Sequence, residues 1–255
     1  MENVESARAP MARPVLIRQS GGHTATPVRA VALVLHGGRE VSVAPVTAHQ
    51  FAVLRMSPIA RHLASAGAPA GLGVWRLRYR YRGWNADAHP VADVRWAVQQ
   101  LRAQHRDVPV VLVGHSMGGR AALRAADEPG VVGIVGLAPW VPPGEPHEQV
   151  AGRRLLVVHG TRDRMTSAKA SKALVDAVRA DALADLVSHD ATPDDAACLG
   201  EAAVTFVHLR HGGHAMLRRA AVWDELTADF VLQAALGVRP GACLAAAITA
   251  GDSVV

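Results

Sequence analysis

The sequence predicts an α/β fold, with a mostly parallel and doubly covered β-sheet. Short, continuously apolar runs alternate with helical patterns from residue 28 to residue 236. Continuous apolar runs are typical of strands buried on both faces, and strands that alternate with helices build parallel sheets. The chain has 255 residues, half of them hydrophobic, which is enough for one large domain of this kind.

The first part of the chain contains three predicted strands and one unusually long connection. An edge strand is expected over residues 14–18, the first strong strand over 28–35 and another over 73–79. Residues 39–55 connect the second of these strands to a helix over 57–66. Connections of this length in compact domains are usually functional or disordered, so this one is expected to line or cover part of a site.

The strand over 73–79 is marked by alternating arginines, namely Arg76, Arg78, Arg80 and Arg82. One interpretation is a site for an anionic substrate. A solvated strand end is the favoured interpretation, because long basic side chains commonly carry their charge out into water.

The second part of the chain continues the alternation of strands and helices. Strands are expected at residues 110–113, 131–137, 154–158 and 204–209. Helices are expected at residues 90–105, directly after residue 116, at 167–180 and at 218–236. The segment 181–202 has no clear pattern. The chain therefore divides into a disordered lead-in over 1–13, a domain over 14–237 and a C-terminal tail over 238–255.

The motif Gly114-His115-Ser116-Met117-Gly118 follows the apolar strand over 110–113 directly. A helical pattern begins at once, so the chain must reverse sharply with Ser116 at the apex. Glycines two residues to either side remove Cβ atoms that would collide with the neighbouring elements. The motif alone arises by chance in roughly one chain in ten of this length, so its context decides its meaning.

Four motifs in order resemble the α/β-hydrolases. They are His36-Gly37-Gly38 after the strand over 28–35, the Gly-His-Ser-Met-Gly-Gly turn, His159-Gly160-Thr161-Arg162-Asp163, and Gly212-Gly213-His214. The resemblance covers about residues 28–236. It implies a catalytic triad of Ser116, Asp163 and His214, each just past the C-terminal end of a strand. It also implies an oxyanion hole formed by the backbone N–H groups of Met117 and Gly38.

Other residues compete for the roles of the acid and the base. Asp163 is favoured as the acid, and its rivals are Asp190, Asp194, Asp195 and Glu145. His214 is favoured as the base, with His211 second. The remaining histidines of the motifs, His36, His115 and His159, are expected to support the site rather than to react.

A metal site is not expected from the histidines at positions 208, 211 and 214. They recur every three residues, but no cysteine or clustered carboxylate joins them. No cofactor is expected either.

The family resemblance implies a serine hydrolase that acts on carboxylic esters through an acyl-enzyme intermediate. Its partner is a small-molecule acyl substrate. A thioesterase or a peptidase of the same fold stays open, as does a hydrolase-like ligand-binding module with little turnover. Between Pro139 and Gly152 only about a dozen polar or proline-rich residues link two strands, so no cap domain is expected there.

Composition limits the other partners and the compartment. The net charge is +5, yet the basic residues are mostly scattered, so nucleic-acid binding is not expected. No apolar run is long enough for a membrane span, and the N-terminus does not resemble a secretory signal. Two distant cysteines, Cys198 and Cys243, suggest no disulfide framework, and a cytoplasmic location is expected. The oligomeric state is not readable.

Overall fold

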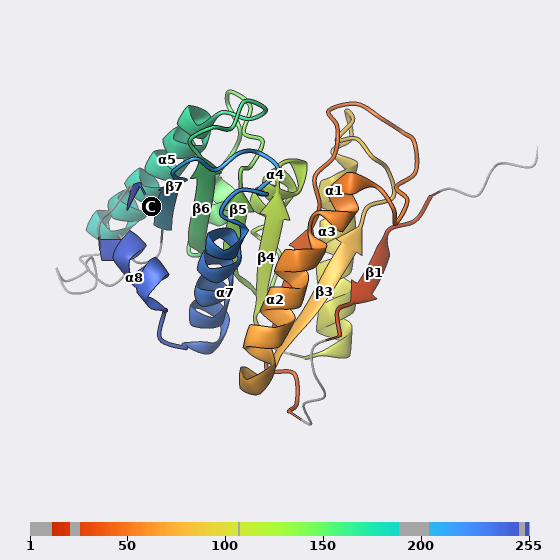
Figure 1. The fold of residues 1–255 in the computed structure, drawn as a ribbon, viewed down its shortest axis with the longest axis horizontal. Coiled ribbons are helices and arrows are strands. Elements are labelled where there is room, and N and C mark those ends of the chain that lie inside the picture. Colours follow the sequence, from red (N-terminus) through yellow and green to blue (C-terminus); the bar gives the residue numbers. More distant parts are fainter. Residues whose placement is uncertain (1–11, 21–25, 107, 189–203, 250–252, 255) are drawn as a thin grey trace, which may run out of the picture.

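The apolar runs become the strands of one twisted sheet (Figure 1). The computed structural model describes residues 12–20, 26–106, 108–188, 204–249 and 253–254. Within these residues the strand order is β1-β3-β2-β4-β5-β6-β7-β8, with β1 antiparallel to β3 and the other pairs parallel. The strands are β1 Val15–Arg18, β2 Ala30–Leu35, β3 Leu72–Arg78, β4 Val110–His115, β5 Val131–Leu137, β6 Arg154–Gly160, β7 Val204–Leu209 and β8 Ser253–Val254.

Helices cover both faces of the sheet, as the sequence predicts (Figure 1). The helices are α1 Phe51–Leu54, α2 Ser57–Gly67, α3 His89–Gln104, α4 Met117–Arg124, α5 Ala168–Ser188, α7 Ala220–Leu236 and α8 Ala242–Thr249. Two short 3-10 turns are η1 Ala68–Ala70 and η2 Glu148–Val150. Helices α2, α7 and α8 pack on one face, and α3, α4 and α5 on the other. None of the described helices combines the length and apolarity that a membrane crossing requires.

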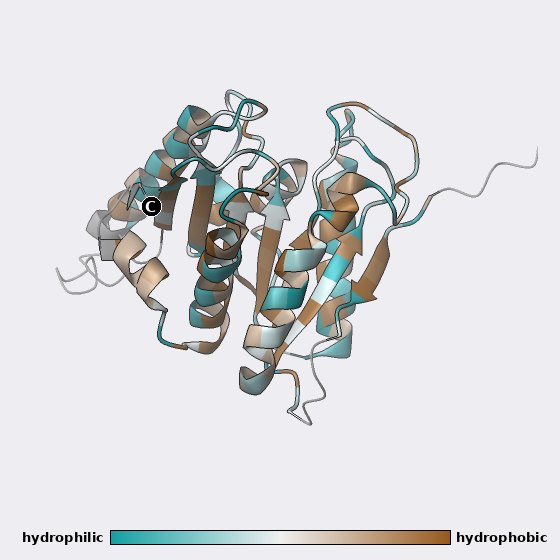
Figure 2. Ribbon diagram, in the orientation of Figure 1, coloured by the Kyte–Doolittle hydropathy of each residue, from teal (hydrophilic) through white to brown (hydrophobic). Residues whose placement is uncertain are grey.

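The core consists of two layers that share the strands of the sheet. Side chains alternate along each strand, so Leu112 faces the α3–α4–α5 layer whereas Val111 and Val113 face the α2–α7–α8 layer. Figure 2 shows the central strands in the hydrophobic colour, with helices α2 and α7 mixing hydrophobic and hydrophilic residues. Each buried Val or Leu contributes about 1.5 to 3 kcal/mol, which makes strand register and helix placement strongly specified.

Four elements differ from the sequence prediction or were not predicted. Helix α5 continues to Ser188, because residues 181–188 contain neither Gly nor Pro and include good helix formers. The connection over 39–55 contains the single turn α1. The tail beyond Gly237 contains α8, which packs on α7, and β8, which pairs with β7. Most of the lead-in over 1–13 lies outside the described residues, as does 189–203.

The crossing from β5 to β6 carries no cap domain. All residues from Ala138 to Arg153 are described, and η2 is the only regular element among them. This outcome confirms the prediction of an uncapped fold. The C-terminal edge of the sheet is therefore uncovered by this crossing.

The start of the long connection is fixed to the loop that follows β3. Backbone hydrogen bonds run from Arg39 N to Arg82 O, from Gly83 N to Ser42 O and from Arg82 N to Ala44 O, at 2.8 to 2.9 Å. The Asn85 side chain adds two bonds to the Ser42 backbone. The two loops therefore behave as one unit at the edge of the sheet where the strands end.

Candidate active site

Ser116 lies at a strained reversal between β4 and α4. Its backbone has φ 54° and ψ −118°, a conformation that residues with a side chain rarely adopt. The turn is tight enough that a Cβ on Gly114 would collide with the backbone of Gly118. A Cβ on Gly118 would lie 2.6 Å from the carbonyl oxygens of Leu35 and His36. Glycine is therefore required on both sides of the serine.

The structure brings Ser116, Asp163 and His214 together from three loops. His214 Nε2 lies 3.1 Å from Ser116 Oγ, and His214 Nδ1 lies 2.9 Å from Asp163 Oδ2. The loops follow β4, β6 and β7, whose C-terminal ends share one edge because these strands are parallel. An ionised carboxylate can only accept, so Nδ1 carries the proton and the Nε2 lone pair faces the serine hydroxyl.

The Asp163 carboxylate is fully buried and still held in its charged form. Burial alone would raise the pKa of Asp163, but hydrogen bonds from His159, His214 and the backbone N–H groups of Thr166 and Met165 lower that pKa below its usual value. Its side chain has 0% exposure. The carboxylate therefore stays ionised at neutral pH.

Thr166 and His159 complete the surroundings of this carboxylate. Thr166 Oγ1 donates to Asp163 Oδ2 at 2.9 Å. His159 Nε2 lies 3.2 Å from the same oxygen, and its Nδ1 lies 3.1 Å from Ser171 Oγ. His159 was expected as a supporting residue, whereas Thr166 was not predicted. The available signal was the Asp-x-x-Thr spacing, because an aspartate often caps the turn that follows it.

His115 and His36 support the loops on either side of the serine. His115 Nε2 donates to the backbone oxygen of His214 at 2.8 Å, and the two rings lie 4.8 Å apart. His36 Nδ1 donates to Gly37 O at 2.6 Å, and His36 Nε2 accepts from Tyr79 N at 3.3 Å. Burial lowers the pKa of His36 to about 4 and that of His115 to about 3. Both rings are therefore neutral at physiological pH.

The two residues named for an oxyanion hole lie next to each other. Met117 is the first residue of α4, where helix N–H groups have no partner within the helix. Gly38 is exposed, and a Cβ there would collide with the Met117 side chain and with Arg82 O. In the described part of the chain, neither backbone N–H has a backbone acceptor outside the regular elements.

Glu145 is the one rival acid that the structure describes, and its partners are arginines rather than His214. Glu145 pairs with Arg120 at 2.7 Å, and the Arg120 guanidinium lies 4.0 Å from the Trp84 ring and 4.5 Å from the Trp140 ring. Glu145 thus belongs to a separate cluster. Asp190, Asp194 and Asp195 lie outside the described residues.

The neighbouring histidines occupy other positions than His214. His208 lies in β7 with its ring 4.9 Å from Phe206, and His211 is exposed in a left-handed turn with φ 60°. Across the described ranges, no group of three His, Cys, Asp or Glu side chains is arranged to hold a metal.

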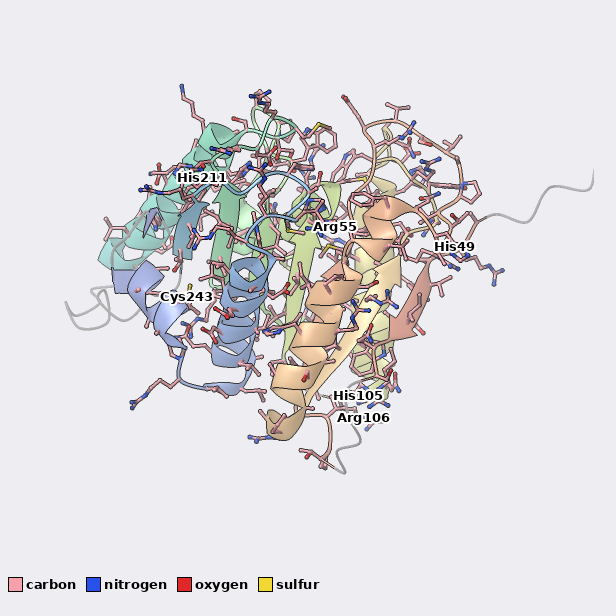
Figure 3. The ribbon with its side chains drawn as sticks, in the orientation of Figure 1. His49, Arg55, His105, Arg106, His211 and Cys243 are labelled. Carbon is pink, nitrogen blue, oxygen red and sulfur yellow. The ribbon has the colours of Figure 1, made fainter. Side chains whose placement is uncertain are left out.

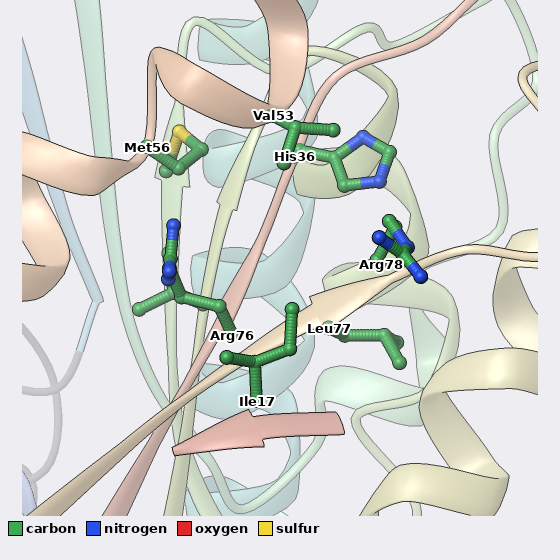
Figure 4. A pocket seen from close by; sticks show the side chains of 8 residues that line it. Ile17, His36, Val53, Met56, Arg76, Leu77 and Arg78 are labelled. Carbon is green, nitrogen blue, oxygen red and sulfur yellow. The ribbon is translucent and has the colours of Figure 1, made fainter. Parts of the chain in front are cut away.

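Two of the four alternating arginines, Arg76 in β3 and Arg80 just beyond its end, are held by protein groups rather than freely solvated. Arg80 pairs with the buried Asp93, and Arg76 donates to Ser57 Oγ at 2.8 Å. This corrects the interpretation of the series as a solvated strand end. Figure 4 shows a cavity of about 10 Å³ beside Arg76, Arg78 and His36, which has room for about one water molecule and none for a substrate.

Comparison with known families and structures concerns the fold of the chain. Residues 46–198 match the family described as alpha/beta hydrolase domain. This segment contains Ser116 and Asp163, whereas His214 lies beyond it. A search of curated protein sequences finds no match.

Solved structures with the same fold come from several organisms. An alpha-beta serine hydrolase homologue from Coxiella burnetii aligns with a TM-score of 0.59 and 16% identity, over 87% of this chain and 93% of that one. A serine hydrolase without lid from Xanthomonas campestris gives 0.58 and 19%, over 89% and 97%. A Pyrococcus furiosus esterase gives 0.55 and 11%, over 82% and 83%. At these identities the likeness shows the fold alone.

The buried histidines predict a loss of stability in mild acid. A histidine whose pKa is lowered by folding binds its proton in the unfolded chain first, so stability falls as the pH drops from about 6.5 towards the folded value. For His36 that window runs from 6.5 to about 4. Between pH 7 and pH 5 this residue should remove about 2 kcal/mol from the free energy of unfolding.

Urea unfolding at pH 7, 6 and 5 measures this effect. The variant His36→Asn should be less stable at pH 7, because Tyr79 N loses its acceptor, but its stability should change less with pH. His49→Gln, at an exposed position, is the matched control, and its stability should change with pH as that of the wild type does. If the free energy of unfolding of His36→Asn changed with pH as steeply as that of the wild type, the assignment of the His36 ring as neutral would be contradicted.

Proposed function

The chain belongs to the alpha/beta hydrolase domain family, and we propose that it is a serine hydrolase that cleaves carboxylic esters through an acyl-enzyme intermediate. The single observation that carries this proposal is the continuous contact from Asp163 through His214 to Ser116, with the serine at a strained apex. Serine is a weak nucleophile unless a base removes its proton and a carboxylate orients that base.

In the proposed acylation, Ser116 Oγ attacks the carbonyl carbon while His214 Nε2 takes the hydroxyl proton. The Oγ–C bond forms, and the bond from this carbon to the leaving alcohol oxygen then breaks. His214 gives its proton to that oxygen, so the alcohol leaves neutral. A water molecule repeats the sequence on the acyl-enzyme and releases the acid. Asp163 accepts the Nδ1–H bond throughout and stabilises the imidazolium that forms.

The negative charge on the carbonyl oxygen needs donors in fixed positions. We assign this role to the backbone N–H groups of Met117 and Gly38. The first turn of α4 begins beneath the serine, so the positive end of its dipole adds to the same stabilisation. The contact between Gly38 and Met117 supports a common target for both donors.

Ser116, His214 and Asp163 could also catalyse related reactions, which are the alternatives to ester hydrolysis. A thioesterase or a peptidase would use the same three residues on a different acyl bond. A ligand-binding module with little turnover would be expected to lack one of the three residues, and all three are present and adjacent. Labelling with a fluorophosphonate, which reacts with activated serines, separates the hydrolases from the binding module.

Ser116→Ala should abolish fluorophosphonate labelling and lower kcat for ester hydrolysis by about 10⁴ or more, with the fold retained. The physical reason is the loss of the only oxygen within reach of His214 Nε2 along the described chain. Peptide mapping of the labelled wild type identifies the modified serine, and steady-state ester assays give kcat. Ser65→Ala, at an exposed site on α2, is the matched control. Undiminished hydrolysis by Ser116→Ala would refute the mechanism.

Asp163→Asn should lower kcat by about 10⁴, because an amide can hold the His214 ring in the wrong tautomer. Steady-state kinetics on one ester, with circular dichroism to verify folding, measures this. Asp176→Asn, which removes an exposed carboxylate on α5, serves as the control and should keep wild-type kinetics. If Asp190→Asn, Asp194→Asn or Asp195→Asn caused the loss instead, the acid would be assigned wrongly.

The uncapped fold predicts a preference for short acyl chains. An open site buries little of a long chain, and each methylene left in water forgoes about 0.8 kcal/mol. We therefore expect kcat/KM to favour short esters and to level off or fall beyond medium length, without activation at a lipid interface. A series of 4-nitrophenyl esters from acetate to palmitate measures this. A steady rise through the long chains would reveal a hydrophobic tunnel, and shortening the 39–55 connection would locate it.

A further inference from the structure

Arg55 is a buried arginine that the proposed mechanism does not use. It follows α1 directly, and only 9% of the residue is exposed. Its Nε atom is buried and has no hydrogen-bond partner among the described residues. Within the described chain no carboxylate lies within ion-pair distance of its guanidinium, whereas other buried or half-buried arginines, such as Arg80 and Arg120, have one.

The position of Arg55 is close to the reacting residues. Figure 3 places it between the upper ends of α2 and α7, beside the C-terminal end of β4. The positive charge of Arg55 contributes to lowering the pKa of His115, behind the larger effects of burial and of His214. His115 precedes Ser116 in the chain and packs against His214. The arginine thus lies near the site, in the short link between α1 and α2.

The protein supplies little compensation for the charge of Arg55. Burial lowers the pKa of Arg55, and the field of Asp224 on α7 raises that pKa in part. Asp224 forms no ion pair with it in the described structure, and the neutral His115 ring cannot offset a positive charge. Burying a charge without a partner is unfavourable, so such a group indicates a ligand of opposite charge.

The loops around the site carry mostly positive charge, as Arg55 does. We define the site loops as residues 36–42, 161–167 and 210–219. Their carboxylates are Glu40 and the buried Asp163, whereas their exposed arginines are Arg39, Arg162, Arg164, Arg210, Arg218 and Arg219. In the described residues none of these arginines forms an ion pair. The excess of positive charge on the site loops attracts negatively charged substrates.

We propose that Arg55 binds an anionic group of the substrate, so that the enzyme acts on esters that also carry a carboxylate. The inference rests on the proposed function and deepens it by naming the substrate class. The guanidinium presents several donors in a fixed plane, which matches the two oxygens of a carboxylate. No contact joins Arg55 to the described Ser116–His214–Asp163 triad, so it would bind a part of the substrate away from the scissile bond.

The test compares charged and neutral esters of equal length within each variant. One series uses the monomethyl esters of malonate, succinate, glutarate and adipate against methyl alkanoates, with the carboxylate on the acyl side. A second series uses acyl esters of glycolate and 3-hydroxypropanoate against simple alkyl esters, with the carboxylate on the alcohol side. Acid release in a pH-stat gives kcat/KM for every ester, and the ratio of charged to neutral is the readout.

We expect the wild type to favour the charged esters of one series by about tenfold to a hundredfold, the range of a hydrogen bond to a charged group. Arg55→Gln should remove most of that ratio, and Arg55→Lys should retain part of it, because lysine keeps the charge without the planar fork. Arg106→Gln removes an exposed arginine at the opposite edge of the sheet (Figure 3) and should keep the wild-type ratio. If Arg55→Gln does not fold, the ratio for charged and neutral esters is compared between Arg55→Lys and the wild type, and a lower ratio in Arg55→Lys is expected.

The outcomes separate this inference from the proposed function. If neither series shows a preference for the charged ester, or if the preference survives in Arg55→Gln, the inference is overturned although the enzyme remains an esterase. If the wild type hydrolyses no ester and Ser116 is not labelled by a fluorophosphonate, the proposed function itself fails. Partial retention in Arg55→Lys together with loss in Arg55→Gln supports a carboxylate site.

Discussion

The arrangement of the site depends on one buried carboxylate. The Asp163 side chain has no exposure to water. Five groups donate hydrogen bonds to its two oxygens: two backbone N–H groups, the Thr166 hydroxyl and the rings of His159 and His214. A carboxylate in this position would be unfavourable without those donors. With them, it joins the loop after β6 to the loop after β7 and determines which nitrogen of His214 faces Ser116.

The sheet makes this convergence possible. Ser116 and His214 are almost a hundred residues apart, yet β4, β5, β6 and β7 are adjacent and parallel, so their C-terminal ends meet at one edge. The register of these strands is specified by alternating apolar side chains that pack into two different helical layers. A slip of one residue would turn those side chains to the wrong layer and move the loops by several ångströms. Packing of the core therefore determines how accurately His214 and Ser116 are placed at the C-terminal edge of the sheet.

Much of this could be predicted from the sequence, for identifiable reasons. The continuous apolar runs of the sheet are strong local signals, and so is a serine with glycines two residues to either side. Thr166 had only a weak local signal, the Asp-x-x-Thr spacing. The position of Arg55 had none, because it depends on which elements far apart in sequence meet in the fold. The end of α5 and the presence of α8 could not be predicted either, because alanine-rich stretches are compatible with helix or loop. Arg80, just beyond the end of β3, shows the same limit, since the buried Asp93 that pairs with it belongs to α3.

An uncapped site restricts the ways in which a substrate can be recognised. Without a lid, little apolar surface of a small substrate leaves water, so the hydrophobic contribution to binding is small. Selectivity must then come from a few directed polar contacts that gain strength where water is excluded. Among the described residues, Arg55 is buried near the site without an ion-pair partner, and the exposed arginines of the site loops have no paired carboxylates. Recognition of charge at a buried arginine is therefore the form of specificity that suits this open architecture, because a single charged contact can replace the apolar surface that a cap would have supplied.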